Sequence, residues 1–146
     1  MRLVVQRVSK ASVCVSGKVI GKIEKGLLVL VGVAEGDSEK DSEQLAEKLS
    51  KLRIMADEND KMNLSISDID GKILVISQFT LHADTSKGNR PSFIKAAEPN
   101  KAEKLYNHFL EKLKSLGIKI ETGNFGAYME INCELDGPVT IMVDSR

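Results

Sequence analysis

The polar run Ser77-Gln78-Phe79-Thr80 closes an apolar stretch that begins at Lys72, and it is the part of the sequence best suited to chemistry. A strand with only a structural role more often continues its apolar pattern, although Ser and Thr also pair across sheets. Hydroxyl, amide and backbone N–H groups at a rigid strand end can orient a water molecule and stabilise an oxyanion. We therefore take residues 77–80 as candidate catalytic residues.

The histidines and cysteines do not form a pattern that would supply a metal site or a catalytic triad. His82 directly follows the apolar stretch and His108 lies in a predicted helix, so neither has the spacing of metal ligands. Cys14 and Cys133 stand in alternating apolar runs, a position typical of buried, inert thiols. We expect no metal and no cofactor, and a reaction that depends on hydroxyl groups, backbone amides or the substrate itself.

Two irregular segments and one Gly-Pro pair carry the remaining candidates. Residues 88–95 join cations and an aromatic ring in a loop, and residues 123–129 are rich in glycine and aromatic side chains. Gly137-Pro138 precedes a predicted strand, where Gly-Pro is usually only a turn. The side chains that we single out in the two segments are Arg90, Phe93, Lys95, Phe125 and Met129.

Strands are predicted at both ends of the chain. Residues 1–34 alternate between apolar and polar side chains, with a hairpin turn at Gly17-Lys18. Within them, residues 26–33 form a continuous apolar run, which predicts a central strand covered on both faces. Residues 72–81 predict another buried strand. The last part of the chain predicts three more strands, at 118–122, 127–135 and 139–143.

Two helices are predicted between these groups of strands. Ser38 can cap a helix whose apolar stripe runs from Leu45 to Leu52. Asn100 followed by Glu103 has the spacing of a capping box, and it predicts a second helix that stops at Gly117. Strands in blocks with helices between them, without a regular βαβ alternation, indicate the α+β class.

The composition describes an ordinary globular domain. The chain has 146 residues, 42% of them hydrophobic and 29% charged, which suffices for a single core without disulfides. Basic and acidic residues number 21 each, so no strong overall field attracts nucleic acid or a membrane surface. No apolar run approaches the ~20 residues that span a bilayer, and residues 1–10 lack a signal-peptide pattern. We predict one cytoplasmic α+β domain, residues 1–146, with a mostly antiparallel or mixed β-sheet or barrel and two main helices.

Taken together, these segments closely resemble the D-aminoacyl-tRNA deacylases. The resemblance runs from MRLVVQRV (residues 1–8) through GLLVLVGV, KMNLS, SQFTL and RPSF to DGPVT (residues 136–140), and so covers essentially the whole chain. SQFTL followed at this distance by GPVT is far more specific than either motif alone. The sequence departs from the family pattern at Leu135, where Asn is frequent, and at His82, where a small residue is usual.

The resemblance implies a chiral proofreading hydrolase of translation quality control. Such an enzyme cleaves the ester between a D-amino acid, or glycine, and the 3′-terminal adenosine of tRNA, and it rejects L-aminoacyl-tRNA. The adenosine would lie against SQFTL with Gln78 near the ribose, and the N–H groups of Phe79 and Thr80 could form an oxyanion hole. Thr80 could instead be a nucleophile, but no adjacent base is evident, so we favour an orienting role. The free ribose hydroxyl would position or activate the attacking water.

The same resemblance assigns chiral selection to Gly137 and Pro138. A cis Gly-Pro pair would extend its carbonyl groups into the pocket of a partner subunit and exclude an L side chain, which implies a homodimer. The sequence alone leaves the state of this bond open, because cis X-Pro bonds are a minority of about 5%. A second hypothesis also stays open. A non-catalytic module on the same fold would bind the acceptor end of tRNA through Arg90, Lys95 and aromatic stacking, without turnover.

Overall fold

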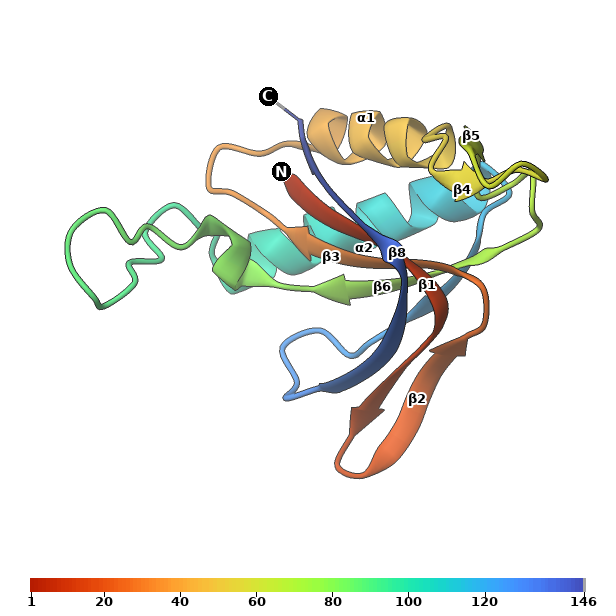
Figure 1. Ribbon diagram of the computed structural model, residues 1–146. Coiled ribbons are helices and arrows are strands. Elements are labelled where there is room, and N and C mark those ends of the chain that lie inside the picture. The colour runs from red at the N-terminus through yellow and green to blue at the C-terminus, as the bar shows by residue number, and fades with distance from the viewer. Residues whose placement is uncertain (146) are drawn as a thin grey trace.

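Residues 1–145, which the computed structural model describes, fold into a mixed β-sheet with helices α1 and α2 packed on one face (Figure 1). The predicted α+β class with two main helices is confirmed for these residues. In chain order the elements are β1 (Arg2–Val15), β2 (Lys18–Ile23), β3 (Gly26–Gly32), α1 (Glu39–Ser50), β4 (Met55–Ala56), β5 (Met62–Leu64), β6 (Lys72–Ser77), the 3-10 helix η1 (Phe79–His82), α2 (Pro99–Ser115), β7 (Lys119–Thr122) and β8 (Glu130–Asp144).

The main sheet has the strand order β2-β1-β3-β6-β7, and β8 pairs with β1. The pairs β3–β6 and β6–β7 are parallel, whereas β1 pairs antiparallel with β2, β3 and β8. A helix lies in each connection between the parallel strands, because a parallel pair needs a long crossover. The sequence pattern did not indicate these crossovers, since a long segment without a clear pattern lies between α1 and β6 and another between β6 and α2. The carboxyl ends of β3 and β6 consequently lie side by side.

The sheet curls until it nearly closes into a barrel, as predicted. Residues 2–8 of β1 pair with β3, and residues 11–15 pair with β2. The sheet bends so strongly that β2 approaches β7. A Cβ atom on Gly21 would lie 2.8 Å from the carbonyl oxygen of Thr122, so only glycine fits between these strands.

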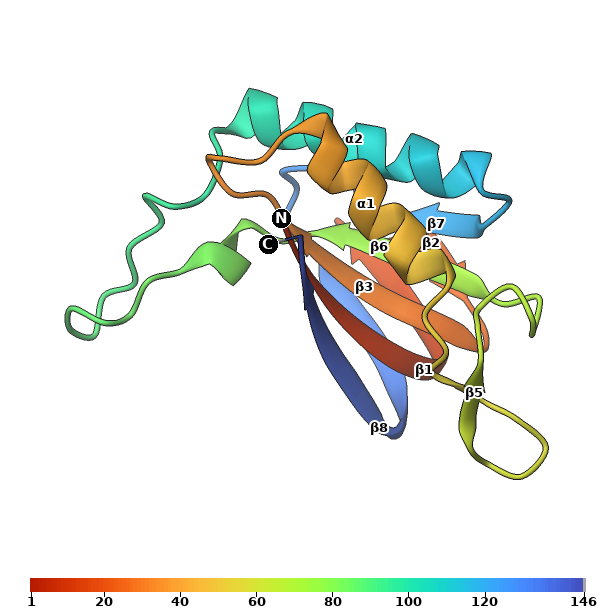
Figure 2. The same ribbon diagram turned by 90° about the horizontal axis from the view of Figure 1, so that it is seen from above.

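Buried side chains form a cluster on each face of this curved sheet. One cluster lies between the sheet and the two helices, where Phe109 and Leu113 of α2 meet Leu45 and Leu49 of α1 (Figure 2). The other lies inside the curve and includes side chains of β1, β2, β3 and β6. β3 therefore contributes to both clusters, which confirms the expectation that residues 26–33 are covered on both faces.

The two helices begin with different caps. Ser38 caps α1 in a capping box with Asp41, as its sequence predicted. The capping box predicted at Asn100 is wrong, because the N-cap of α2 is Glu98, two residues earlier, and the helix begins with Pro99. The Glu98 carboxylate accepts hydrogen bonds from the N–H groups of Asn100 and Lys101 at 3.1 and 2.7 Å. Proline at the first helical position has its φ already set for the helix.

Ion pairs at four-residue intervals join α1 to α2. Since both sequences ascend together, the helices run parallel, and the matched spacing places Glu39, Glu43 and Glu47 of α1 opposite basic residues of α2. The outer two are the ion pairs Glu39–Lys104 at 2.9 Å and Glu47–Lys112 at 2.8 Å, and between them His108 Nε2 lies 3.0 Å from a carboxylate oxygen of Glu43. We call this set the helix ladder.

Three predicted strands differ in the structure. The strand predicted at 72–81 ends at Ser77, and η1 follows it, so part of the polar run is helical. The strands predicted at 127–135 and 139–143 are a single strand, β8, which continues through Gly137-Pro138. Gly-Pro is therefore not a turn between strands but an irregularity within one.

The expectation that both cysteines are buried was wrong. Cys133 is exposed and Cys14 is half-buried. For Cys133 the cause is the position of β8, because this strand packs one edge against β1 and leaves most of its side chains outside both apolar clusters. Among the described helices, none is long and apolar enough to cross a membrane.

Candidate active site

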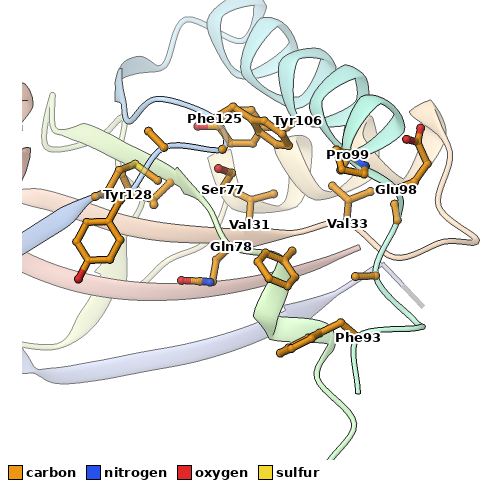
Figure 3. A pocket seen from close by; sticks show the side chains of 18 of the residues that line it. Val31, Val33, Ser77, Gln78, Phe93, Glu98, Pro99, Tyr106, Phe125 and Tyr128 are labelled. Atoms are coloured by element: carbon orange, nitrogen blue, oxygen red, sulfur yellow. The ribbon is translucent and has the colours of Figure 1, made fainter. Parts of the chain in front are cut away.

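A cavity of about 770 Å³ opens at the carboxyl ends of β3 and β6 (Figure 3). The volume is within the range of roughly 300–1,000 Å³ that is usual for small-molecule sites. Four segments form its wall: the end of β3, residues 76–79, residues 93–106 at the start of α2, and residues 125–131. Ligands commonly bind beyond the carboxyl ends of adjacent parallel strands, so the site matches its place in the fold.

The floor of the cavity is held by a hydrogen bond to the carbonyl oxygen of Val75 in β6. The Tyr106 hydroxyl of α2 donates to this oxygen at 2.9 Å, and the N–H of Gly123 donates to it at 3.2 Å. Burial raises the pKa of Tyr106, so the phenol stays neutral and remains a donor. Its ring contacts Phe125 at a centroid distance of 5.8 Å. One carbonyl thus ties α2, β6 and the segment after β7 into a fixed apolar floor.

Ser77 and Gln78 supply polar groups at one end of this apolar cavity. The Gln78 N–H donates to the carbonyl oxygen of Val31 at 2.8 Å and so extends the β3–β6 pairing by one residue. The Gln78 side-chain amide lies 2.6 Å from the Thr80 hydroxyl oxygen. A side-chain amide is not a base, so this contact orients the Thr80 hydroxyl and does not activate it as a nucleophile.

The first two N–H groups of η1 have no acceptor among residues 1–145, and they belong to Phe79 and Thr80. The turn is closed by other donors: the Leu81 N–H lies 3.4 Å from the Gln78 carbonyl oxygen, and the Ala83 N–H lies 3.0 Å from that of Thr80. A sheet would pair such groups, whereas the start of a helix leaves them free. The change from strand to helix after Ser77 is therefore what makes these donors available.

Aromatic rings line the mouth of the cavity. Phe79 and Phe93 form an edge-to-face pair with centroids 5.0 Å apart, and they are 56% and 38% exposed. Tyr128 stands at another part of the mouth and is 87% exposed (Figure 3). An exposed ring beside a concave apolar site is suited to contact with a base or a second apolar group.

A loop that projects beside the mouth carries the predicted basic residues. Hydrogen bonds from Ser86 and the ammonium group of Lys95 hold the pKa of Asp84 well below its usual range. Lys95 is thus engaged in an ion pair with Asp84 at 3.0 Å. Lys87 and Arg90 are exposed and form no ion pair with any residue from 1 to 145. The two lysines of this loop therefore differ, because only Lys87 has its charge free.

The structure brings some of the predicted site residues together and leaves others apart. Those that line the cavity are Ser77, Gln78, Phe79, Phe93, Phe125 and Met129. Thr80 lies next to it on η1, and Arg90 and Lys95 lie on the projecting loop. Gly137 and Pro138 are exposed and are not part of the cavity wall of the same chain.

Gly137 and Pro138 belong to a bulge in β8, residues 136–139. Gln6 of β1 pairs with Thr140, and Val8 pairs with Leu135, so these four residues of β8 stand opposite Arg7 alone. The bond between Gly137 and Pro138 is cis. Gly137 has a φ of +132°, and a Cβ atom there would lie 2.9 Å from both the N and a methyl carbon of Val139. Only glycine fits this position without strain.

Arg7 holds the start of the bulge, and the sequence analysis did not single it out. Its Nε donates to the carbonyl oxygen of Asp136 at 3.1 Å and lies at the same distance from the Asp136 carboxylate. Its Nη1 donates to the carbonyl oxygen of Ile54 at 3.0 Å. The sequence did carry a sign of this role, because Arg7 continues the alternation of the inward-facing residues Leu3 and Val5. In the structure Arg7 is only 9% exposed. A cation at an inward position indicates partners that the fold must supply.

The fold and the cavity define an α+β protein with an apolar cavity at the ends of parallel strands. The sequence profile of the family described as D-Tyr-tRNA(Tyr) deacylase matches residues 4–144. A D-aminoacyl-tRNA deacylase of Thermosipho melanesiensis is 57% identical over 147 aligned residues, which include 100% of this chain and 98% of that protein. One of Thermotoga petrophila is 55% identical, over 99% of this chain and 97% of that protein. The chain belongs to the D-Tyr-tRNA(Tyr) deacylase family.

Two solved structures share the fold of this chain. A protein described as c-Myc DNA Unwinding Element Binding Protein superposes with a TM-score of 0.94 at 42% identity, over 100% of this chain and 99% of that one. A probable eukaryotic D-amino acid tRNA deacylase shares the fold, with a TM-score of 0.87 at 15% identity and 98% of each chain covered.

Proposed function

We propose that this chain hydrolyses the ester of D-aminoacyl-tRNA, and of Gly-tRNA, and spares L-aminoacyl-tRNA. The observation that carries the proposal is the apolar cavity whose polar end places Ser77 and Gln78 beside the unpaired N–H groups of Phe79 and Thr80. The match of family and of relatives at more than 50% identity supports it. The proposed substrate is the 3′ aminoacyl end of a tRNA, and the proposed location of the protein is the cytoplasm.

The proposed chemistry requires an oriented water and a stabilised oxyanion. Water adds its oxygen to the ester carbonyl carbon, and the N–H groups of Phe79 and Thr80 bind the oxygen that becomes negative. The ester bond to the ribose then breaks, and the proton that water loses ends on the ribose oxygen. The second ribose hydroxyl positions this water, so the reaction uses neither a metal nor a cofactor. The Thr80 hydroxyl accepts a hydrogen bond from the Gln78 side-chain amide, and in this proposal it thereby orients that amide towards the ribose.

The proposed contacts with the substrate follow the wall of the cavity. Phe125 and Met129 line the apolar interior, and Phe93 lies at the mouth, where it contacts the RNA end. Arg90 contacts the phosphate backbone from the projecting loop, and Lys95 supports that loop through Asp84. With these roles, the proposal predicts that the apolar cavity supplies most of the free energy of substrate binding and that charged side chains supply a small part.

Chiral selection in this proposal requires a second copy of the chain. Gly137 and Pro138 lie outside the cavity of their own chain, so their carbonyl groups can exclude an L side chain only from a partner's cavity. β8 has one edge paired with β1 and no strand partner on its other edge among residues 1–145. Its exposed side chains include Ile131, Leu135 and Met142, which are apolar and suited to an interface. The proposed active form is a homodimer.

Side-by-side deacylation of D-Tyr-tRNA, L-Tyr-tRNA and Gly-tRNA tests the function. We expect the D and glycine esters to be lost and the L ester to persist, with the same rates in the presence of EDTA. Tight binding of uncharged tRNA without loss of any ester would instead support the non-catalytic module. Analytical ultracentrifugation tests the homodimer separately, and a monomer at working concentration would contradict the partner's role in chiral selection.

A further inference from the structure

The turn η1 is held at its carbonyl end by one side chain from the first strand. Arg2 Nη1 donates to the carbonyl oxygen of Leu81 at 3.1 Å. This oxygen and the free N–H groups of Phe79 and Thr80 belong to the same four-residue turn. A short turn moves as a unit, so a bond that fixes Leu81 also fixes the direction of the two N–H groups.

The guanidinium of Arg2 is itself held in place. Its Nε donates to one carboxylate oxygen of Asp144 at 2.8 Å, and its Nη2 donates to the other at 3.3 Å. This forked contact fixes the plane of a guanidinium and thereby aims the remaining donor at Leu81. The same contact lowers the pKa of Asp144. Arg2 can therefore act as a rigid link between β8 and η1.

A glycine completes the arrangement beneath the turn. In the sheet, Arg2 pairs with Gly32 of β3 on one side and with Asp144 of β8 on the other, so the three residues form one row across three strands. A Cβ atom on Gly32 would lie 2.9 Å from Cβ of Leu81 and 3.1 Å from the carbonyl oxygen of Gln78. The absence of a side chain at Gly32 is what lets η1 lie this close to the sheet.

We propose that the row Gly32–Arg2–Asp144 positions the oxyanion-binding N–H groups, and that Arg2 is its positioning residue. Gly32 provides the space, Asp144 orients the guanidinium, and Arg2 makes the bond to η1. The inference rests on the function proposed above, because it assigns no new reaction. It adds a requirement, namely that the rate of the chemical step depends on an ion pair outside the cavity.

The test compares two ion pairs between the same two strands. Arg2→Lys keeps the charge but loses the two-point contact with Asp144, and Arg2→Ala removes both. The control is Lys10→Ala, which breaks the ion pair Lys10–Glu134 between β1 and β8. The atoms of this pair lie 2.9 Å apart and do not contact η1. With D-Tyr-tRNA we expect kcat to fall about 10- to 100-fold in Arg2→Ala, because misplacement by about 1 Å has an effect of this order, while KM stays within about twofold. Arg2→Lys should be intermediate, and Lys10→Ala should match the wild type. In the background of Arg2→Ala, a further Asp144→Asn change should have no additional effect.

Amide resonances separate this inference from the proposed function. In ¹H–¹⁵N spectra, the Phe79 and Thr80 signals should shift in Arg2→Lys and not in Lys10→Ala. Gly32→Ala should shift the same two signals, because it displaces η1 from below. If the wild type fails to hydrolyse D-Tyr-tRNA, the proposed function is wrong, and the resonances still decide whether Arg2 positions the turn. Unchanged Phe79 and Thr80 signals, or equal kcat values in Arg2→Lys and wild type, would overturn the inference.

Discussion

Arg2 and Arg7 belong to the same strand and make the same kind of contact in two regions of the molecule. Each donates to a backbone carbonyl of an irregular segment and to a carboxylate of β8. Arg2 serves η1 beside the cavity, whereas Arg7 serves the bulge that lies outside it. One strand thus fixes two irregular segments separately, and a change in one of them need not disturb the other.

The two arginines differ in burial, and this difference decides how much removal of each side chain would lower the free energy of unfolding. The side chain of Arg2 is 34% exposed and that of Arg7 is 11% exposed. Removing a buried donor leaves its carbonyl partners without hydrogen bonds, which is expensive, whereas water can replace an exposed one. Arg7 therefore contributes to stability as well as position, and Arg2 contributes mainly position.

The largest effect should come from the N–H donors that the Arg2 region holds. Phe79→Pro removes one donor and should lower the deacylation rate of D-Tyr-tRNA about 10²–10³-fold. Thr80→Ala keeps its N–H and should retain measurable activity. Single-turnover kinetics with both variants provide the measurement. Complete loss of activity in Thr80→Ala with substrate still bound would revive Thr80 as a nucleophile.

A mixed dimer can show that the Arg7 region acts on the other chain. Gly137→Ala should displace the bulge, because a Cβ atom there meets Val139, and should raise hydrolysis of L-Tyr-tRNA about 10- to 100-fold. Coexpression with Phe79→Pro under two affinity tags yields heterodimers in which one intact cavity faces one intact bulge. These heterodimers should regain selective hydrolysis of the D ester. Purified heterodimers that still cleave the L ester would contradict selection by the partner subunit.

Stability should distinguish the two arginines directly. Arg7→Met leaves the carbonyl oxygens of Ile54 and Asp136 without their donor and should cost about 1–3 kcal/mol in the free energy of unfolding. Arg2→Ala removes a more exposed contact and should cost about 0–1 kcal/mol. Urea denaturation of both variants measures the difference. Equal losses would show that burial does not separate the two regions.

Salt dependence should be weak, because few cations near the cavity are free. Lys95 pairs with Asp84, Lys104 pairs with Glu39, and Lys101 donates to the carbonyl oxygen of Glu35, which leaves Lys87 and Arg90 on the projecting loop as the cations without a partner among residues 1–145. With two phosphates neutralised, the slope of log affinity against log salt for the tRNA end should be about −1.4. Titrations of tRNA binding at several salt concentrations measure it. A slope near −8 would require a much larger footprint.

The smallest effect should appear in the helix ladder, which touches neither region. The Lys112 contact lowers the pKa of Glu47. Since the folded pKa lies below the unfolded one, the pair stabilises the protein above the unfolded pKa, and this contribution is lost as pH falls through the folded pKa. Lys112→Gln should lower Tm by at most about 2 °C at neutral pH and by less near pH 3. A Tm difference that grows on acidification would contradict the sign.

The sequence predicted the parts of the fold that depend on periodicity. The continuous apolar run at residues 26–33 could be read correctly, because a strand buried on both faces loses its alternation. The turn at η1 could not be predicted, since SQFTL has ordinary strand propensity. The space for the turn comes from Gly32 on a neighbouring strand, which has no side chain to meet Leu81. Ser77, Gln78 and Phe79, which the sequence suggested as catalytic, line one cavity with Thr80 beside it, yet the reason that the N–H groups of Phe79 and Thr80 have no acceptor among residues 1–145 lies in this turn.

The bulge was misinterpreted for a similar reason. Gly-Pro has a local tendency to form turns, so Gly137-Pro138 divided one strand into two in the sequence analysis. The pairing of Leu135 with Val8 and of Thr140 with Gln6 restores a single strand, and such long-range register is not visible in local sequence. The inward position of Arg7 was the one local sign that this part of β8 needs support.

The bulge also bears on how this fold can change in evolution. Residues 130–134 and residues 140–144 each keep a constant register with β1, and residues 136–139 take no part in the pairing. An inserted or deleted residue in an ordinary strand reverses the faces of every side chain beyond it. Here the same event would change only the reach of the bulge and leave the pairs on both sides as they are. Natural selection can therefore adjust the length of this projecting segment as a separate module, without a change in the strand pairing of the sheet that carries it.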